Sequence, residues 1–134
     1  MGMPKLVKRL ILIFGLVLSM ASFVFGQTKP ATTPSVEPPV PKALIPLDKK
    51  YRSTKANFTA HPKDKKAKDA YVEATVRLGH ETMISPDYPA KFKYKKTLQL
   101  YREALKLDPT NPVAKQESDL IIQIYKQMGR PVPK

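Results

Sequence analysis

The fold is decided by residues 93–111, KYKKTLQLYREALKLDPTN, near the C-terminal end of a 134-residue chain. Tyr94, Leu98, Tyr101 and Leu105 follow one another at intervals of four, three and four residues. Those intervals place side chains along one face of an α-helix. The proline in Asp108-Pro109 cannot continue a helix. The stretch therefore predicts an amphipathic helix over about 93–107.

Downstream of this helix, Asn111 and Pro112 have the chemistry of a helix start, with Asn as N-cap and Pro at the first helical position. Apolar residues then recur at helical spacing as far as Met128, and Gly129 followed by Pro131 forms a stop signal. A further helix is expected from Pro112 to about Met128.

Upstream, residues 63–83 predict a third helix. Its apolar stripe consists of Ala67, Ala70, Tyr71, Ala74 and Leu78. Val72 and Val76 flank that stripe, so this helix should pack on two sides. Residues 84–92 contain two prolines and should form a loop. A shorter helix over 48–59, with Asp48 as its N-cap, is one interpretation of the remaining residues, and an extension of the linker before it is the other.

One junction occurs twice in the sequence. Residues 62–68 (PKDKKAK) match residues 109–115 (PTNPVAK) in Pro, Asp or Asn, Ala and Lys, at a spacing of 47 residues. Each proline follows an apolar helix end, with Phe58 or Leu105 four residues before it. We expect the same helix-turn-helix junction in both places.

Residues 93–111 resemble the second helix of a tetratricopeptide repeat. Five residues carry the likeness: Tyr94, Tyr101, Ala104, Leu105 and Pro109. Thr97 stands where the family usually has Ala, and Leu78-Gly79 is similar to the Leu-Gly pair of the family's first helix. The resemblance covers residues 55–129 at most and amounts to one complete repeat with a half-repeat on either side. The 47-residue period departs from the family's period of about 34.

The fold expected is therefore all-α: a short antiparallel array of three to four helices similar to tetratricopeptide repeats. The family presents a concave helical face to a peptide or protein, so the resemblance implies a protein-interaction module. So few helices should be marginally stable alone, and this favours self-association or docking on a partner.

The N-terminus has the layout of an export signal. Lys5, Lys8 and Arg9 precede an uncharged stretch, residues 10–26, and a polar composition begins at Gln27. Residues 1–26 are expected to be either a signal peptide cleaved after Gly26 or an uncleaved signal anchor that contacts the membrane through residues 10–26. Both alternatives deliver the rest of the chain across the cytoplasmic membrane, to the periplasm or the extracellular space.

The remainder divides by composition. Residues 27–47 carry six prolines and predict an extended linker without helix. Residues 48–130 should form the helical domain, and residues 131–134 a short tail. With no Cys in the chain, apolar packing must hold that domain together without disulfides.

The net charge of +13 favours anionic partners. Catalysis finds little support, because the sequence has no Cys nucleophile, Gly-rich phosphate loop or G-x-S-x-G motif. His80, Glu81 and Asp87 could in principle hold a metal, but their sequence positions suit surface residues better. We expect no enzyme activity, no cofactor and no metal.

The leading hypothesis is a tetratricopeptide-like adaptor or scaffold in the cell envelope that binds one or more protein partners. An acidic protein is one such candidate. Its partner-binding residues are expected on the helix at 63–83 and near it, namely Lys63, Lys65, Lys66, Lys68, Glu73, Thr75, Arg77 and Asn57. The alternative is a basic envelope protein that binds anionic lipid or polysaccharide through its lysines. Nucleic acid is an unfavourable candidate partner, because an exported chain is separated from the DNA of the cell.

Overall fold

The computed structural model describes residues 36–134, and the expected export segment lies outside them. The described residues are all-α, with no strand among them. They form a short 3-10 turn, η1 (Lys42–Leu44), followed by α2 (Ile45–Ala60), α3 (Lys65–Ile84), α4 (Ala90–Leu107) and α5 (Pro112–Gln127). The helices expected at 63–83, 93–107 and 112–128 are confirmed to within a few residues.

The linker expected over residues 27–47 was wrong at its C-terminal end. Residues 42–44 are helical in η1, and α2 begins at Ile45 with Pro46 in its first turn. Proline is tolerated there because the first amides of a helix have no intrahelical acceptor. Asp48 is a first-turn residue rather than the N-cap, and its carboxylate accepts a hydrogen bond from Arg52 Nε at 2.6 Å.

The repeated junction is confirmed. α2 ends at C-cap His61 and α4 ends at C-cap Asp108, both with an extended φ near −130°. Three residues later Asp64 caps α3 and Asn111 caps α5, each with a side-chain oxygen that accepts a backbone amide hydrogen. The two junctions are thus built alike 47 residues apart, as the sequence match predicts.

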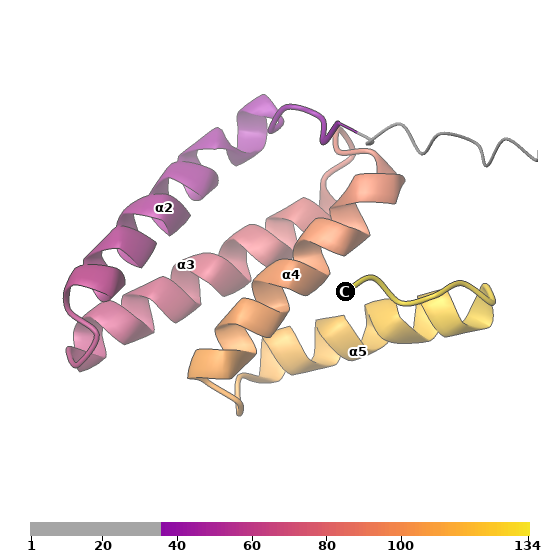
Figure 1. Ribbon diagram of the computed structural model, residues 1–134. Coiled ribbons are helices and arrows are strands. Elements are labelled where there is room, and N and C mark those ends of the chain that lie inside the picture. Colours follow the sequence, from indigo (N-terminus) through magenta and orange to yellow (C-terminus); the bar gives the residue numbers. More distant parts are fainter. Residues whose placement is uncertain (1–35) are drawn as a thin grey trace, which may run out of the picture. The chain divides into compact units, whose positions relative to one another are not determined.

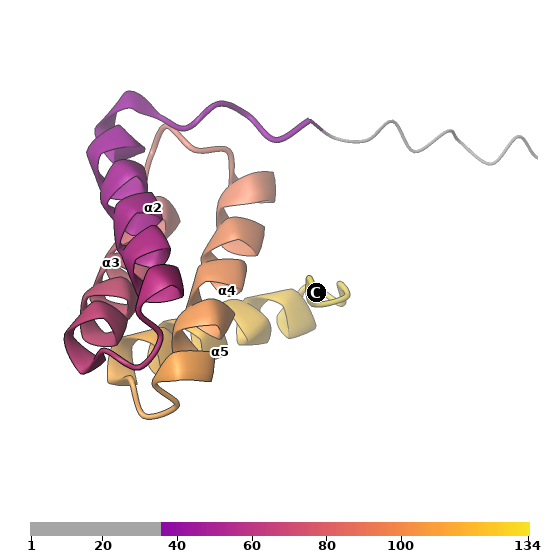
Figure 2. The ribbon, with the colours of Figure 1, turned by 60° about the vertical axis from the view of Figure 1, so that its left-hand side comes forward.

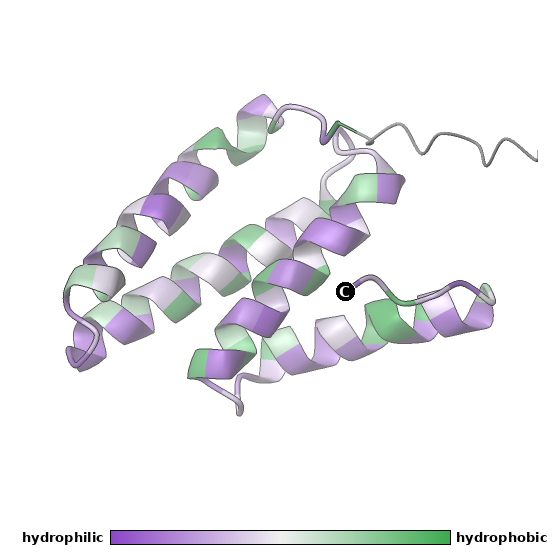
Figure 3. Cartoon of the chain, in the orientation of Figure 1, coloured by the Kyte–Doolittle hydropathy of each residue, from purple (hydrophilic) through white to green (hydrophobic). Residues whose placement is uncertain are grey.

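Helix α3 is the centre of the domain, because it contacts α2, α4 and α5. Successive helices pack against one another as hairpins, and α5 leads away from the end of α4 (Figures 1 and 2). Hydrophilic and hydrophobic positions are interspersed along all four helices (Figure 3). Helices α3, α4 and α5 each bury one face, whereas α2 has no buried residue.

Helices α3 and α4 approach each other closely at Gly79. A Cβ built on Gly79 would lie 2.6 Å from Tyr101 Cε1, so the absence of a side chain lets the tyrosine ring lie against the backbone of α3. Beside it the Thr97 hydroxyl donates a hydrogen bond to the Gly79 carbonyl at 3.3 Å. This contact fixes the orientation of α3 and α4, and with it the face of α3 that meets α5.

Candidate partner-binding groove

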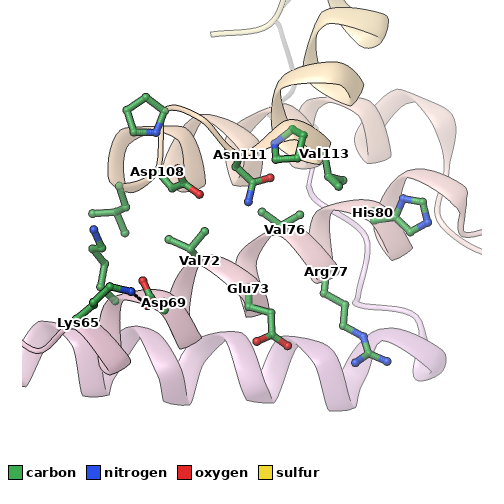
Figure 4. Close-up of a pocket in the computed structure, with 14 residues that line it drawn as sticks. Lys65, Asp69, Val72, Glu73, Val76, Arg77, His80, Asp108, Asn111 and Val113 are labelled. Carbon is green, nitrogen blue, oxygen red and sulfur yellow. Dashed lines mark hydrogen bonds and ion pairs between the residues drawn. The ribbon is translucent and has the colours of Figure 1, made fainter.

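A groove lies between α3 and the turn that leads from α4 into α5. Its volume is about 840 Å³, and it is open to solvent along one side. Val72 and Val76 of α3 point towards the turn, and Val113 in the first turn of α5 faces them (Figure 4). Leu107 completes an apolar floor. A mostly apolar concavity of this size is typical of ligand-binding sites.

The turn that forms one wall is held by its own side chains. Asp108 Oδ1 accepts hydrogen bonds from the Thr110 amide at 3.1 Å and from the Thr110 hydroxyl at 2.8 Å. Asn111 Oδ1 accepts the Ala114 amide at 3.0 Å. The Thr110 hydroxyl lowers the pKa of the Asp108 carboxyl, and the nearby Lys68 ammonium adds a smaller attraction. The wall therefore carries a carboxylate in a fixed position.

Charged side chains of both signs form the rim. Lys65 and Asp69 are ion-paired within α3, one turn apart. Glu73 and Arg77 follow on the rim away from α5 (Figure 4). Neither Glu73 nor Arg77 has an ion-pair or hydrogen-bond partner within residues 36–134. The rim thus offers an unpaired acid and an unpaired base to a ligand.

A polar bridge lies at the end of the groove farthest from Lys65. His80 Nδ1 is 2.8 Å from Glu117 Oε1, and the Tyr101 hydroxyl donates a hydrogen bond to Glu117 Oε2. Burial, reinforced by this hydrogen bond, raises the pKa of the Tyr101 phenol far above its ordinary value. The single carboxylate of Glu117 therefore joins α3, α4 and α5.

The structure separates the residues expected to bind a partner into three groups. Lys65, Lys68, Glu73 and Arg77 line the groove. Lys63 is exposed in the turn before α3, Lys66 is exposed in its first turn and Asn57 is exposed on α2, but these three do not line the groove.

The expectation for Thr75 was wrong. Its side chain is 0% exposed, and its hydroxyl donates a hydrogen bond to the Tyr71 carbonyl at 2.7 Å. The physical reason is that other helices cover α3 on more than one side, so Thr75, between Ala74 and Val76, is enclosed. Its hydroxyl then forms its hydrogen bond with a backbone carbonyl one turn earlier in the same helix.

The second wall of the groove, Asp108, Asn111 and Val113, was not expected from the sequence as a binding element. The signal that could have indicated it is the repeated junction, because a unit repeated at a fixed period places α3 and α5 side by side in the same direction. Two contacts agree with that arrangement: Val113 faces Val76, and four residues further along each helix Glu117 pairs with His80 (Figure 4).

The residues that carry the family resemblance have structural roles. Leu78, Tyr101 and Ala104 are buried, and Tyr94 and Leu105 are half-buried. Leu105 packs against the cluster formed by Val72, Tyr101, Ala104 and Ala114. Pro109 is exposed and lines the groove.

Two negative findings apply to residues 36–134. No group of three or more acidic or histidine side chains there is placed to hold a metal ion, and His80 faces Glu117 rather than a cluster with Glu81 and Asp87. No helix in this part of the chain combines the length and apolar character needed to cross a bilayer.

No protein-family model, curated protein or solved structure matches the chain.

Proposed function

We propose that this chain is a non-catalytic interaction module of tetratricopeptide type that takes a segment of a partner protein into the groove between α3 and the α4–α5 turn. In this assignment α3 and α4 form the complete repeat, while α2 and α5 are the half-repeats on either side. The observation that carries the proposal is the groove itself, with an apolar floor from Val72, Val76 and Val113 below a charged rim.

The chemistry of the groove favours a peptide over a small molecule. The site is open along one side, so a peptide bound in it could extend beyond both ends of the groove. Apolar side chains of the segment would pack on the three valines, while the unpaired Glu73 and Arg77 would select charges of the partner. Such complementarity sets specificity and association rate more than affinity.

The proposal includes location. The basic and apolar layout of residues 1–26 supports export across the cytoplasmic membrane, with cleavage before Gln27 or retention as an anchor. Cell fractionation with intact-mass analysis distinguishes these forms. A full-length chain recovered from the cytoplasm would contradict export.

Groove binding is tested by selecting peptides against the full chain and then measuring the affinity of the selected peptides for two variants. Val113→Glu places a carboxylate on the groove floor, and Val113 is 41% exposed in the first turn of α5, where an acid suits the helix dipole. Leu120→Glu is the matched control, because Leu120 is 48% exposed on the same helix but does not line the groove.

We expect Val113→Glu to weaken peptide binding at least about tenfold, which corresponds to about 1.4 kcal/mol, and Leu120→Glu to bind like the unchanged chain. Equal binding by both variants, or the absence of any selected peptide, would rule the groove out as the partner site.

A further inference from the structure

The outer face of α4 carries a basic stripe. Lys91, Lys95, Arg102 and Lys106 follow one another at intervals of four, seven and four residues, with Gln99 between them. These intervals keep the side chains on one side of the helix. Fifteen residues at the helical rise extend over about 22 Å. The stripe therefore runs almost the whole length of α4 (Ala90–Leu107).

This face is the exposed side of α4, except that Arg102 is half-buried. Its C-terminal half, with Gln99, Arg102 and Lys106, borders a shallow hollow that it shares with Lys55 and Phe58 of α2. The buried residues Thr97, Leu100 and Ala104 occupy the opposite side of the helix, and the buried Leu98 lies at the edge of the stripe. The groove is formed by α3 and the α4–α5 turn, so a ligand in the groove would leave the stripe accessible.

The charge of the stripe is not neutralised by the described part of the chain. None of its four cations has an ion-pair partner there, whereas Lys55, Lys65 and Lys115 are each paired with an acid. The neighbouring acid on α4, Glu103, is already engaged by Lys55 and Tyr51. Lys91 also lies 5.6 Å from the centre of the Phe92 ring, which places a cation and an aromatic side chain together at the start of the stripe.

The stripe begins where the chain enters the domain. Glu37, the second described residue, accepts a hydrogen bond from the Tyr88 hydroxyl at 2.8 Å and lies 3.6 Å from Lys96 Nζ. Both contacts hold the incoming chain beside the first turns of α4. Upstream, ten residues (27–36) separate Glu37 from the apolar stretch 10–26, and ten residues reach at most about 35 Å.

We propose that the outer face of α4 is a contact surface for anionic lipid headgroups, on which the domain rests with its groove facing away from the membrane. Basic residues near an anionic leaflet are attracted to it within a Debye length. The four cations of the stripe provide such an attraction. Because the incoming chain lies beside the first turns of α4, the stripe is within reach of a bilayer when residues 10–26 are inserted in it. The surface requires anionic headgroups and no particular lipid species.

The experiment uses a chain that starts at Gln27, so that the apolar stretch does not dominate binding. This chain is a fair test because residues 36–134 form a compact unit of their own. Co-sedimentation is measured with vesicles of phosphatidylcholine alone and with vesicles that also contain phosphatidylglycerol. One variant carries Lys91→Gln, Lys95→Gln, Arg102→Gln and Lys106→Gln.

The matched control carries Lys63→Gln, Lys66→Gln, Lys126→Gln and Arg130→Gln. It removes the same three Lys and one Arg, all exposed and off α4. Circular dichroism checks that both variants are folded, and Gln is nearly as good a helix former as Lys and Arg.

We expect binding to the anionic vesicles only, lost near 1 M salt, where the Debye length is about 3 Å. The α4 variant should bind several hundredfold more weakly, because each of its four basic residues near the surface contributes roughly a fivefold factor, and the control should lose much less. Equal losses in the two variants would overturn the proposal, since they would show attraction by net charge alone. Salt-independent binding, or binding to soluble polyglutamate without binding to anionic vesicles, would overturn it in favour of a different partner class.

Discussion

Tyr101 and Glu117 meet where three helices converge, and the buried phenol of Tyr101 donates a hydrogen bond to the Glu117 carboxylate. The other oxygen of that carboxylate contacts His80 at 2.8 Å. One side chain of α5 therefore connects the last helix to both α3 and α4, and it does so at the end of the groove.

Glu117→Ala should lower the free energy of unfolding by about 1–3 kcal/mol, because it leaves a buried hydroxyl without an acceptor. Glu117→Gln keeps an acceptor oxygen and should lose less. Urea denaturation of both variants measures the difference. If Glu117→Ala is as stable as the unchanged chain, the bridge contributes nothing to the docking of α5.

Stability should fall above pH 10. Burial raises the pKa of the Tyr101 phenol in the folded state, so there the proton stays bound while an unfolded tyrosine, with a pKa of about 10, releases it. Fewer protons on the unfolded chain mean that the free energy of unfolding decreases as pH rises beyond that value, by up to about 1.4 kcal/mol per pH unit.

Tyr101→Phe removes this titration, so its urea midpoint should decline less steeply between pH 9 and pH 11. Comparing slopes within each variant removes the starting difference in stability. Parallel slopes for the two chains would show that the phenol ionises as freely in the fold as in the unfolded state.

Gly79→Ala should destabilise the domain although alanine is the better helix former. The new methyl group would lie 2.6 Å from Tyr101 Cε1, and overpacking of this kind costs about 1–3 kcal/mol, against a gain of about 1 kcal/mol in helix propensity. Gly129→Ala is the comparison, since nothing lies within 4 Å of its added Cβ and its strain comes only from the backbone φ of 62°. A stabilised Gly79→Ala variant would mean that the helices separate easily at this point.

The repeated junction predicts equal penalties for losing either cap. Asp64→Ala and Asn111→Ala each remove a side-chain acceptor of a backbone amide hydrogen at 2.8 and 3.0 Å, and each should cost about 1 kcal/mol. The double variant should show the sum, because the two sites share no partner. A cap whose removal has no effect would show that its junction is held by other contacts.

Local signals accounted for most of the fold. The apolar spacing of residues 93–107, the Asn111-Pro112 start and the match between residues 62–68 and 109–115 placed three helices and both tight turns correctly. Gly129 ends the last helix with a positive φ, as its position after Met128 indicates. Each of these features depends on neighbours within a few residues of the chain.

The site depended on contacts between distant residues, and the sequence predicted it only in part. Lys65, Lys68, Glu73 and Arg77 were named from the expected exposure and charge of the helix at 63–83, and they line the groove, but Thr75 could not be recognised as buried without knowing what covers α3. The pairing of His80 with Glu117, 37 residues apart, follows from the register between α3 and α5, which no local pattern specifies. Pro46 was assigned to the linker because proline breaks the interior of a helix. Proline is, however, tolerated in the first turn of a helix, which is where Pro46 lies in α2.

Hydrogen exchange of the full chain, with and without a selected peptide, tests the central claim most directly, because it locates the partner without relying on a substitution. Binding in the groove should protect the backbone amides around Val72–Val76 on α3 and in the α4–α5 turn, and leave those on the outer half of α2 unchanged. Protection confined to α2 and the outer face of α4, with none around Val76 and Val113, would contradict the assignment of the groove as the partner site.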